Sequence, residues 1–229
     1  MRKFLALLLC LCLLPIPAGA AGNTKYIALT FDDGPSGRFT RRLLDGLADR
    51  NAKATFFLCG YRILEYPDEA QRIAEEGHEI GIHGYNHDSM QYMSRRAIAA
   101  EIEDTRALLP AGCDPNWFRP PGGICSDGVR QVAECKNLGI LSWSVDPRDW
   151  DTSNSAAVTR TVVTAAEDGA VVLLHDMSDS SVDAALAIVD HLQRQGYEFV
   201  TVSELVRIRR ISIRHGEVYT HFPSDTGEK

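Results

Sequence analysis

The sequence predicts an α/β protein whose parallel sheet is closed, or nearly closed, into a barrel of the TIM type. Strand-like and helix-like segments alternate about seven times between residues 24 and 206, and no repeat, low-complexity run or long linker interrupts them. The 229-residue chain is 45% apolar and 24% charged, which is ordinary for a globular protein of one domain, or at most two. Such alternation implies a parallel sheet, and this many units favour a barrel over an open sheet.

The first part of the alternation contains three strands and two helices. The apolar, β-prone stretch YIALTF predicts a strand at 26–31, and the leucines of the next segment share one face of a helix at 40–52. KATFFLCG predicts a second strand at 53–60. A helix at 66–77 has a proline near its start and a glycine at its end, and HEIGIH at 78–83 is the third strand.

The middle part repeats this order twice. A helix at 94–110 is stopped by Pro110, and WFRP predicts a short strand at 117–120. The helix at 127–139 has an aspartate as its candidate N-cap and a glycine at its end. ILSWSVD then predicts a strand at 140–146.

The last part completes the alternation and leaves a tail. A helix at 155–169 precedes a strand at 170–176, and a helix at 181–196 precedes a strand at 197–205 that runs into a short helix. The tail of residues 207–229 breaks the pattern. Its SIRHGEVYTHF stretch could form a small hairpin around the glycine, and PSDTGEK is expected to be disordered.

Residues 1–20 have the pattern of a secretory signal peptide. Arg2 and Lys3 form a basic start, residues 4–14 are an apolar run, and an Ala-Gly-Ala sequence ending at Ala20 offers a cleavage site. The run is too short to span a bilayer comfortably, although an uncleaved anchor is the alternative. We therefore expect a secreted or cell-envelope protein without stable membrane insertion after cleavage.

The charge and the cysteines of the mature chain limit its partners and its covalent structure. Cleavage removes two basic residues, so the formal net charge of −7 becomes −9, which disfavours binding to nucleic acid or to an anionic membrane. Four cysteines remain in this exported chain, an even number that permits two disulfides. One local bridge among the last three is plausible, but the sequence leaves the pairing open. The four are Cys59, Cys113, Cys125 and Cys135.

Ionisable or turn-forming residues follow five predicted strands directly. In a parallel barrel the carboxyl ends of the strands form one face, and active sites are built there. Adjacent aspartates repel each other and gain nothing from burial, so a core strand that ends on two of them needs an explanation. The five strand ends read Asp32-Asp33, His83 with His87, Arg119 to Gly123, Asp146 with Asp149-Trp150, and His175-Asp176.

Two of the seven histidines are candidate metal ligands. The spacing of His83 and His87 lets two imidazoles converge on one metal, although two ordinary loop histidines would look the same. Asp33 can complete a set of two histidines and one carboxylate, as in hydrolytic zinc sites and non-haem iron sites. A metal would absorb the charge of one aspartate and leave Asp32 to act as a base. The alternative for the aspartate pair alone is an Asp-Gly-Pro turn.

The five motifs resemble, in order, those of the polysaccharide deacetylase family, also called the NodB-homology domain or carbohydrate esterase family 4. The resemblance covers about residues 26–206, so we expect a catalytic domain over 21–206 and a separate tail over 207–229. It implies a distorted (β/α) barrel of seven or eight units that removes acetyl groups from N-acetylated sugars or acetylated xylan with a divalent metal. The motifs are T-F-D-D-G-P (30–35), H-G-Y-N-H (83–87), R-P-P-G-G (119–123), D-P-R-D-W (146–150) and L-L-H-D (173–176).

The resemblance implies the roles of the first three motifs, position by position. Asp33, His83 and His87 resemble the metal ligands of the family. Zn²⁺ is the default ion, and Co²⁺ or another divalent ion can also suit such a set. Asp32 resembles the general base that deprotonates the attacking water, and Arg119 resembles the arginine that holds this base.

The remaining motif residues resemble the acid and the substrate contacts of the family. His175 resembles the general acid that protonates the leaving amine, and Asp149 resembles the carboxylate that orients it. Leu173 resembles the apolar residue that lines the acetyl-methyl pocket, with Trp150 nearby. The backbone N–H of Gly122 resembles the donor to the oxyanion, where such a donor contributes about two to three orders of magnitude in rate.

Two glycines depart from the family pattern. The family usually has Ser or Thr where this chain has Gly84, so a hydrogen bond that stiffens the loop is missing and metal affinity could be lower. The family usually has an aromatic residue where this chain has Gly122, so one side of the groove should be more open. Neither change removes a reacting group.

The expected function is therefore metal-dependent deacetylation of a glycan polymer that contains N-acetylglucosamine, with peptidoglycan as the first candidate. The motifs do not separate this substrate from chitin oligosaccharides or acetylated xylan. A non-catalytic glycan-binding protein on the same barrel would lack the base, the acid or a ligand, and this sequence retains all of them. The oligomeric state is left open.

Overall fold

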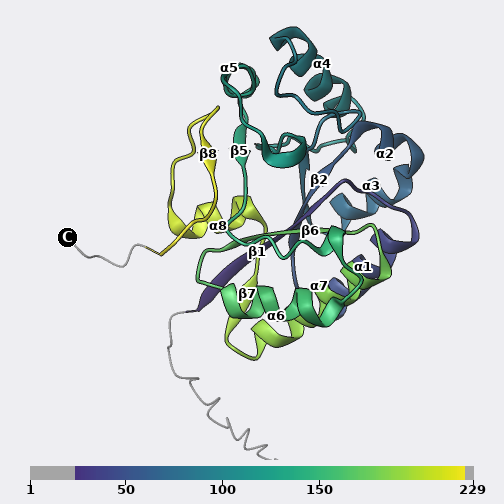
Figure 1. Ribbon diagram of the computed structural model, residues 1–229, viewed down its shortest axis with the longest axis vertical. Coiled ribbons are helices and arrows are strands. Elements are labelled where there is room, and N and C mark those ends of the chain that lie inside the picture. Colours follow the sequence, from purple (N-terminus) through teal and green to yellow (C-terminus); the bar gives the residue numbers. More distant parts are fainter. Residues whose placement is uncertain (1–23, 225–229) are drawn as a thin grey trace, which may run out of the picture.

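Eight strands form one curled sheet in the computed structural model, which describes residues 24–224 (Figure 1). Neighbouring strands pair in parallel in the order β6-β1-β2-β3-β4-β5-β8, and β7 pairs with the first residues of β1. The predicted parallel sheet is thus confirmed. The strands are β1 (Lys25–Asp32), β2 (Ala54–Leu58), β3 (Glu79–Ile82), β4 (Trp117–Phe118), β5 (Gly139–Leu141), β6 (Val171–His175), β7 (Tyr197–Phe199) and β8 (Val218–Tyr219).

The barrel is distorted because its edges meet over a short stretch only. Beyond the end of β5, Val145 forms an isolated parallel bridge with Val172 of β6. The N–H of Leu173 donates to the carbonyl of Val145 at 2.9 Å. This contact brings the carboxyl ends of β5 and β6 together and confirms the predicted, incompletely regular TIM-like barrel.

Eight helices surround the sheet within residues 24–224. Helix α6 packs on α7 and α7 on α1, while α4 packs on α5 at the other end of the molecule (Figure 1). The described helices include none that is long and apolar enough to cross a bilayer. The signal-peptide prediction concerns residues 1–20, which lie outside the described residues. The helices are α1 (Arg38–Asp49), α2 (Gly60–Glu65), α3 (Pro67–Glu75), α4 (Arg95–Arg106), α5 (Asp127–Cys135), α6 (Ser155–Ala165), α7 (Asp179–Gln193) and α8 (Val202–Arg209).

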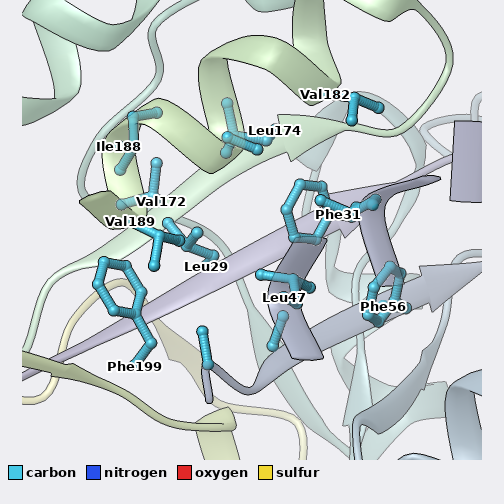
Figure 2. Packing of buried hydrophobic residues seen from close by; sticks show 14 of the residues in the cluster. Leu29, Phe31, Leu47, Phe56, Val172, Leu174, Val182, Ile188, Val189 and Phe199 are labelled. Carbon is cyan, nitrogen blue, oxygen red and sulfur yellow. The ribbon is translucent and has the colours of Figure 1, made fainter. Parts of the chain in front are cut away.

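The side chains of β1 alternate between two cores. Leu29 and Phe31 point out of the barrel and are fully buried against α1 and α7 (Figure 2). Burial of each such side chain contributes about 1.5–3 kcal/mol to folding. Ala28 faces the inner core instead. Because strand side chains alternate with a period of two, Thr30 and Asp32 share the inward face with Ala28.

The same alternation directs the residues that follow the other strands. Ile82 and Phe118 belong to an outer core, so His83 and Arg119, one position on, face inwards. On β6, Leu174 is in an outer core, and His175 faces inwards. Outward apolar packing thus fixes the register that aims polar side chains at the inside of one barrel end.

The tail does not form the predicted hairpin. Its strand β8 pairs in parallel with β5, with Val218 opposite Ile140, and β8 lies beside β5 in Figure 1. Phe222 is fully buried in the inner core. The hairpin prediction is wrong because the exposed edge of β5 is a better partner for these residues than a second strand of the tail. The disorder predicted for the last residues falls mostly on 225–229, outside the described residues.

The local disulfide considered for the cysteines is not formed. All four cysteines between residues 24 and 224 are free thiols. Cys125 lies before α5 and Cys135 at its end, and this helix of nine residues is about 13 Å long. A disulfide needs α-carbons within about 7 Å. Cys59 is buried at the end of β2, and burial raises the pKa of its thiol, which makes it unreactive.

Candidate active site

The two aspartates at the end of β1 reach the same cavity although they are neighbours. Asp32 is the last inward-facing residue of the strand. Asp33 has a φ of 71°, in the left-handed region that few residues other than glycine adopt and that aspartate tolerates. Because the chain turns at this residue, the second carboxylate is not directed to the opposite face of the sheet. Both side chains therefore line one cavity.

Asp32 is held by an arginine buried inside the barrel. Arg119 Nη1 donates to Asp32 Oδ1 at 2.6 Å and to Thr30 Oγ1 at 2.8 Å. Its Nε donates to the carbonyl of Leu141 at 2.9 Å, and its Nη2 to the carbonyl of Ser142 at 2.8 Å. Burial lowers the pKa of Arg119, and the charge of Asp32 opposes this shift. The guanidinium thus fixes the Asp32 side chain at one defined position in the wall of the cavity.

Asp33, His83 and His87 come together at the mouth of this cavity. Asp33 Oδ1 lies 3.2 Å from His83 Nε2 and 3.1 Å from His87 Nε2. One ligand atom from each of the three residues lies within 4.8 Å of the others. His83 Nδ1 donates to the carbonyl of Arg119 at 2.7 Å. Since a carbonyl only accepts, Nδ1 carries the proton and Nε2 presents its lone pair to the cavity.

This arrangement fits a divalent cation. Asp33 Oδ1 is buried and accepts no hydrogen bond from the described residues, which is costly for a carboxylate oxygen without a cation. The Nε2 atoms of His83 and His87 both lie close to this oxygen, and two histidines with one carboxylate are a zinc-type donor set. His87, like Asp33, has a left-handed φ, of 62°. Backbone strain of this kind tends to occur at functional sites.

His175 is oriented by a buried carboxylate. Its Nδ1 donates to Asp149 Oδ1 at 2.9 Å, and its backbone N–H donates to Asp149 Oδ2 at 2.9 Å. Its Nε2 faces the cavity, 3.9 Å from Asp33 Oδ2. Burial opposes the imidazolium, but the hydrogen bond and charge of Asp149, with the charges of Asp32 and Asp33, raise the pKa of His175 to about 9. At neutral pH, Nε2 can therefore give up a proton.

The cavity has a volume of about 410 Å³ and opens at the carboxyl ends of the strands. Of the site residues predicted from sequence, all but Arg119 and Asp149 line it, and these two hold Asp32 and His175 from behind. A cavity of about 430 Å³ between α6 and α7 has no such cluster of carboxylates and imidazoles. The lining residues are Asp32, Asp33, His83, His87, Gly122, Trp143, Asp146, Trp150, Leu173 and His175.

Two lining residues were not assigned a role from the sequence. Trp143 and Asp146 lie between β5 and the short helix η2 (Asp149–Asp151), in the stretch that the sequence predicts as the end of a strand. Asp146 could be noticed as a strand-end acid, whereas Trp143 carried no signal that separates it from a core residue. Trp150 is 59% exposed, and the guanidinium of Arg148 lies 4.9 Å from its ring centre. The lining thus offers two indole surfaces beside the ionisable cluster.

The barrel and this cluster define a protein with a two-histidine, one-carboxylate site at the carboxyl ends of its strands. The chain belongs to the polysaccharide deacetylase family, whose model matches residues 19–140. A peptidoglycan-N-acetylglucosamine deacetylase of Bacillus cereus is 41% identical over 195 residues, which cover 82% of this chain and 91% of that protein.

Two further comparisons agree with this assignment. The peptidoglycan-N-acetylglucosamine deacetylase PgdA of Listeria monocytogenes is 40% identical over 187 residues, 81% of this chain but only 40% of that longer protein. The solved structure of a family 4 acetyl xylan esterase from Clostridium thermocellum, in complex with a cobalt ion, matches with a TM-score of 0.81 and 33% identity. The match covers 87% of this chain and 100% of that one.

Proposed function

We propose that this protein is a metal-dependent deacetylase that hydrolyses the N-acetyl group of N-acetylglucosamine in peptidoglycan, after export directed by residues 1–20. The observation that carries this proposal is the convergence of three kinds of group on one cavity. These are a candidate metal-ligand set, a carboxylate held by a buried arginine, and an imidazole held by a buried carboxylate. The names of the relatives from Bacillus cereus and Listeria monocytogenes support the choice of substrate.

Amide hydrolysis needs a base for the attacking water and an acid for the leaving amine. Asp32 is proposed as the base: it accepts a proton from the water as the water's oxygen bonds to the acetyl carbon, and Arg119 fixes the carboxylate. His175 is proposed as the acid: its Nε2 gives a proton to the sugar nitrogen as the C–N bond breaks, and Asp149 stabilises the charged ring. The products are acetate and a glucosamine residue.

Asp33, His83 and His87 would hold the divalent metal. A Zn²⁺ ion there would supply a Lewis acid that polarises the acetyl carbonyl and lowers the pKa of water from 15.7 towards about 7. The backbone N–H of Gly122 is proposed to donate to the carbonyl oxygen as it gains negative charge. Leu173 and Trp150 are proposed to contact the acetyl methyl group and the sugar.

The charges around the cavity favour N-acetylglucosamine over a sugar that carries a lactyl carboxylate. In the part of the chain that the structure describes, three aspartates line the cavity and no lysine or arginine does. Asp32 pairs with Arg119 and Asp33 faces the proposed metal site, whereas Asp146 accepts a hydrogen bond from the backbone N–H of Arg148 and forms no ion pair within the described residues. A substrate carboxylate that lies near Asp146, away from His175 and the proposed metal, would meet a like charge, which costs binding energy. A neutral acetamido sugar meets no such penalty.

Removal of the metal should abolish acetate release. We expect the purified protein to release acetate from peptidoglycan faster than from chitopentaose or acetylxylan, to lose this activity in excess chelator, and to regain it with Zn²⁺. Acetate measured enzymatically with the three substrates in parallel tests this. Faster acetate release from acetylxylan than from peptidoglycan would contradict the proposal that peptidoglycan is the substrate. Absence of release from all three by zinc-loaded protein would contradict the function and favour a glycan-binding protein.

A side chain at Gly122 should change substrate affinity in addition to lowering stability. Gly122 has a φ of 67°, and no described heavy atom lies within 4 Å of the place that a Cβ would take. Gly112, remote from the cavity, has a φ of 87° and equally open space, which makes it a matched control. We expect Gly122→Tyr and Gly112→Tyr each to lose about 1–2 kcal/mol in the free energy of unfolding.

Only Gly122→Tyr should alter KM for peptidoglycan, because only this ring would narrow the open side of the groove. Steady-state kinetics and urea unfolding of both variants separate the two effects. An equal KM in both variants would show that this side of the cavity does not contact the glycan.

A further inference from the structure

The loop between the two candidate histidine ligands is bonded to a carboxylate of helix α4. Glu101 Oε2 accepts hydrogen bonds from the backbone N–H of Tyr85 at 2.6 Å and from that of Asn86 at 3.0 Å. Glu101 Oε1 accepts a third from Asn86 Nδ2 at 3.2 Å. A single side chain from a packed helix thus binds both residues that lie directly before His87.

The opposite side of this loop is bonded to the first turn of α2. The N–H of Gly60 donates to the carbonyl of Gly84 at 3.1 Å, and the N–H of Tyr61 donates to that of Tyr85 at 3.1 Å. The loop carbonyls are therefore fixed by backbone that continues from β2. The N–H groups of Tyr85 and Asn86 instead donate to the side chain of Glu101. This contact is therefore the one that a substitution can remove.

The loop needs such support because its own sequence does not provide it. Gly84 has no hydroxyl that could bond within the loop, and its φ of 84° favours glycine. A Cβ at Gly84 would lie 2.8 Å from Met90 Cε and 3.3 Å from Glu101 Oε2. His87 also has a left-handed φ. A segment with two left-handed residues in five is not a regular turn, so its shape must be set by contacts from outside.

We propose that Glu101 is a positioning residue that holds His87 in metal-binding geometry by binding the two backbone amides directly before it. This inference rests on the proposed metal site. Hydrogen bonds from N–H groups to a carboxylate are shorter and about twice as strong as neutral ones, so two of them can fix the backbone on which His87 is mounted. Glu101 does not contact the ligand set directly. It acts through the amides of Tyr85 and Asn86.

Zinc affinity of the purified protein tests this inference without any measurement of catalysis. We expect Glu101→Ala to weaken Zn²⁺ binding about 10- to 100-fold, as is usual when a residue that supports a metal ligand is removed. Competition with a chromophoric chelator gives the Kd. Glu103→Ala is the matched control: it removes an acid two residues further along α4 that pairs with Lys136 on the surface. Its Kd should equal that of the wild type.

Glu101→Gln separates positioning from charge. The amide retains one oxygen that can accept from Tyr85 and Asn86 but has no negative charge. Positioning predicts that Glu101→Gln weakens Zn²⁺ binding by a clearly smaller factor than Glu101→Ala does, because the retained oxygen still fixes the backbone before His87. A Kd equal to that of Glu101→Ala would overturn positioning and show a charge effect instead. Unchanged Zn²⁺ affinity in Glu101→Ala would also overturn it.

Amide hydrogen exchange of the metal-free wild type adds a test that needs no variant. Slow exchange at Tyr85 and Asn86 is expected, and exchange as fast as in an open loop would contradict the inference even if Glu101→Ala fails to fold. The proposed function can fail separately. A wild type that binds no Zn²⁺ contradicts the metal site, whereas a wild type that binds Zn²⁺ as tightly as Glu101→Ala contradicts only the role of Glu101.

Discussion

Asp32→Asn should lower kcat for acetate release by about 10²- to 10⁴-fold, with little change in KM, because a carboxamide cannot take the proton of the attacking water. The shape of the site should persist. An asparagine oxygen can still accept from Arg119 Nη1, which now donates to Asp32 Oδ1 at 2.6 Å. The arginine also keeps its bonds to Thr30, Leu141 and Ser142.

The zinc content of each variant makes this prediction specific. Asp32→Asn should retain its metal, since the candidate ligands Asp33, His83 and His87 are unchanged. Asp33→Asn should lose both metal and activity. Asp104→Asn, on the exposed face of α4, is the control and should match the wild type. Residual activity of Asp32→Asn within tenfold of the wild type would exclude Asp32 as the base.

The different roles proposed for these neighbouring aspartates follow from what surrounds each one. Asp32 is 3% exposed and is paired with a guanidinium from the inside of the barrel. Asp33 faces an imidazole nitrogen from each of two histidines and has a buried oxygen that accepts no hydrogen bond from the described residues. One carboxylate thus has its cation in the protein, and the other is arranged for a cation from solution. These different surroundings give a physical reason for a core strand that ends on two acids.

The strand ends could be predicted because an apolar strand stops where its first ionisable residue appears. Asp32, His83 and His175 each follow such a run, and the period-two rule aims them inwards. Their mutual roles came from the resemblance to a family, since the sequence does not contain the distance between Arg119 and Asp32.

Helix α2 was missed because GYRILE directly follows a strand and has no side-chain cap. The support from Glu101 could not be predicted, because it depends on how α4 packs over a loop sixteen residues earlier.

Parallel pairing of β8 with β5 shows a different limit of sequence reasoning. The tail contains a glycine between two short apolar stretches, which is a hairpin signal. Strand β5 is only three residues long and comes soon after helix α5, so nothing in its own sequence marks one of its edges as unpaired. Competition between partners for one strand is settled by three-dimensional packing, here by burial of Phe222 in the inner core.

Arg119→Met should lower the free energy of unfolding by about 3–5 kcal/mol, because it leaves one member of a buried ion pair without its partner. Arg119 is fully buried, and its loss also leaves the carbonyls of Leu141 and Ser142 without these donors. The lower end of the range is expected, since Asp32 borders the cavity and water can reach it. Urea unfolding, followed by circular dichroism, measures the change.

A double-mutant cycle tests whether the ion pair causes this loss. Asp32→Asn should cost less stability than Arg119→Met, because the guanidinium keeps three neutral acceptors whereas the aspartate would keep no cation. In the double variant Asp32→Asn/Arg119→Met the carboxylate charge is gone, so the combined loss should be smaller than the sum of the two single losses. Additive losses would show that Arg119 stabilises the barrel through its carbonyl contacts and its packing. In that case its bond to Asp32 would matter for the chemistry of the site alone.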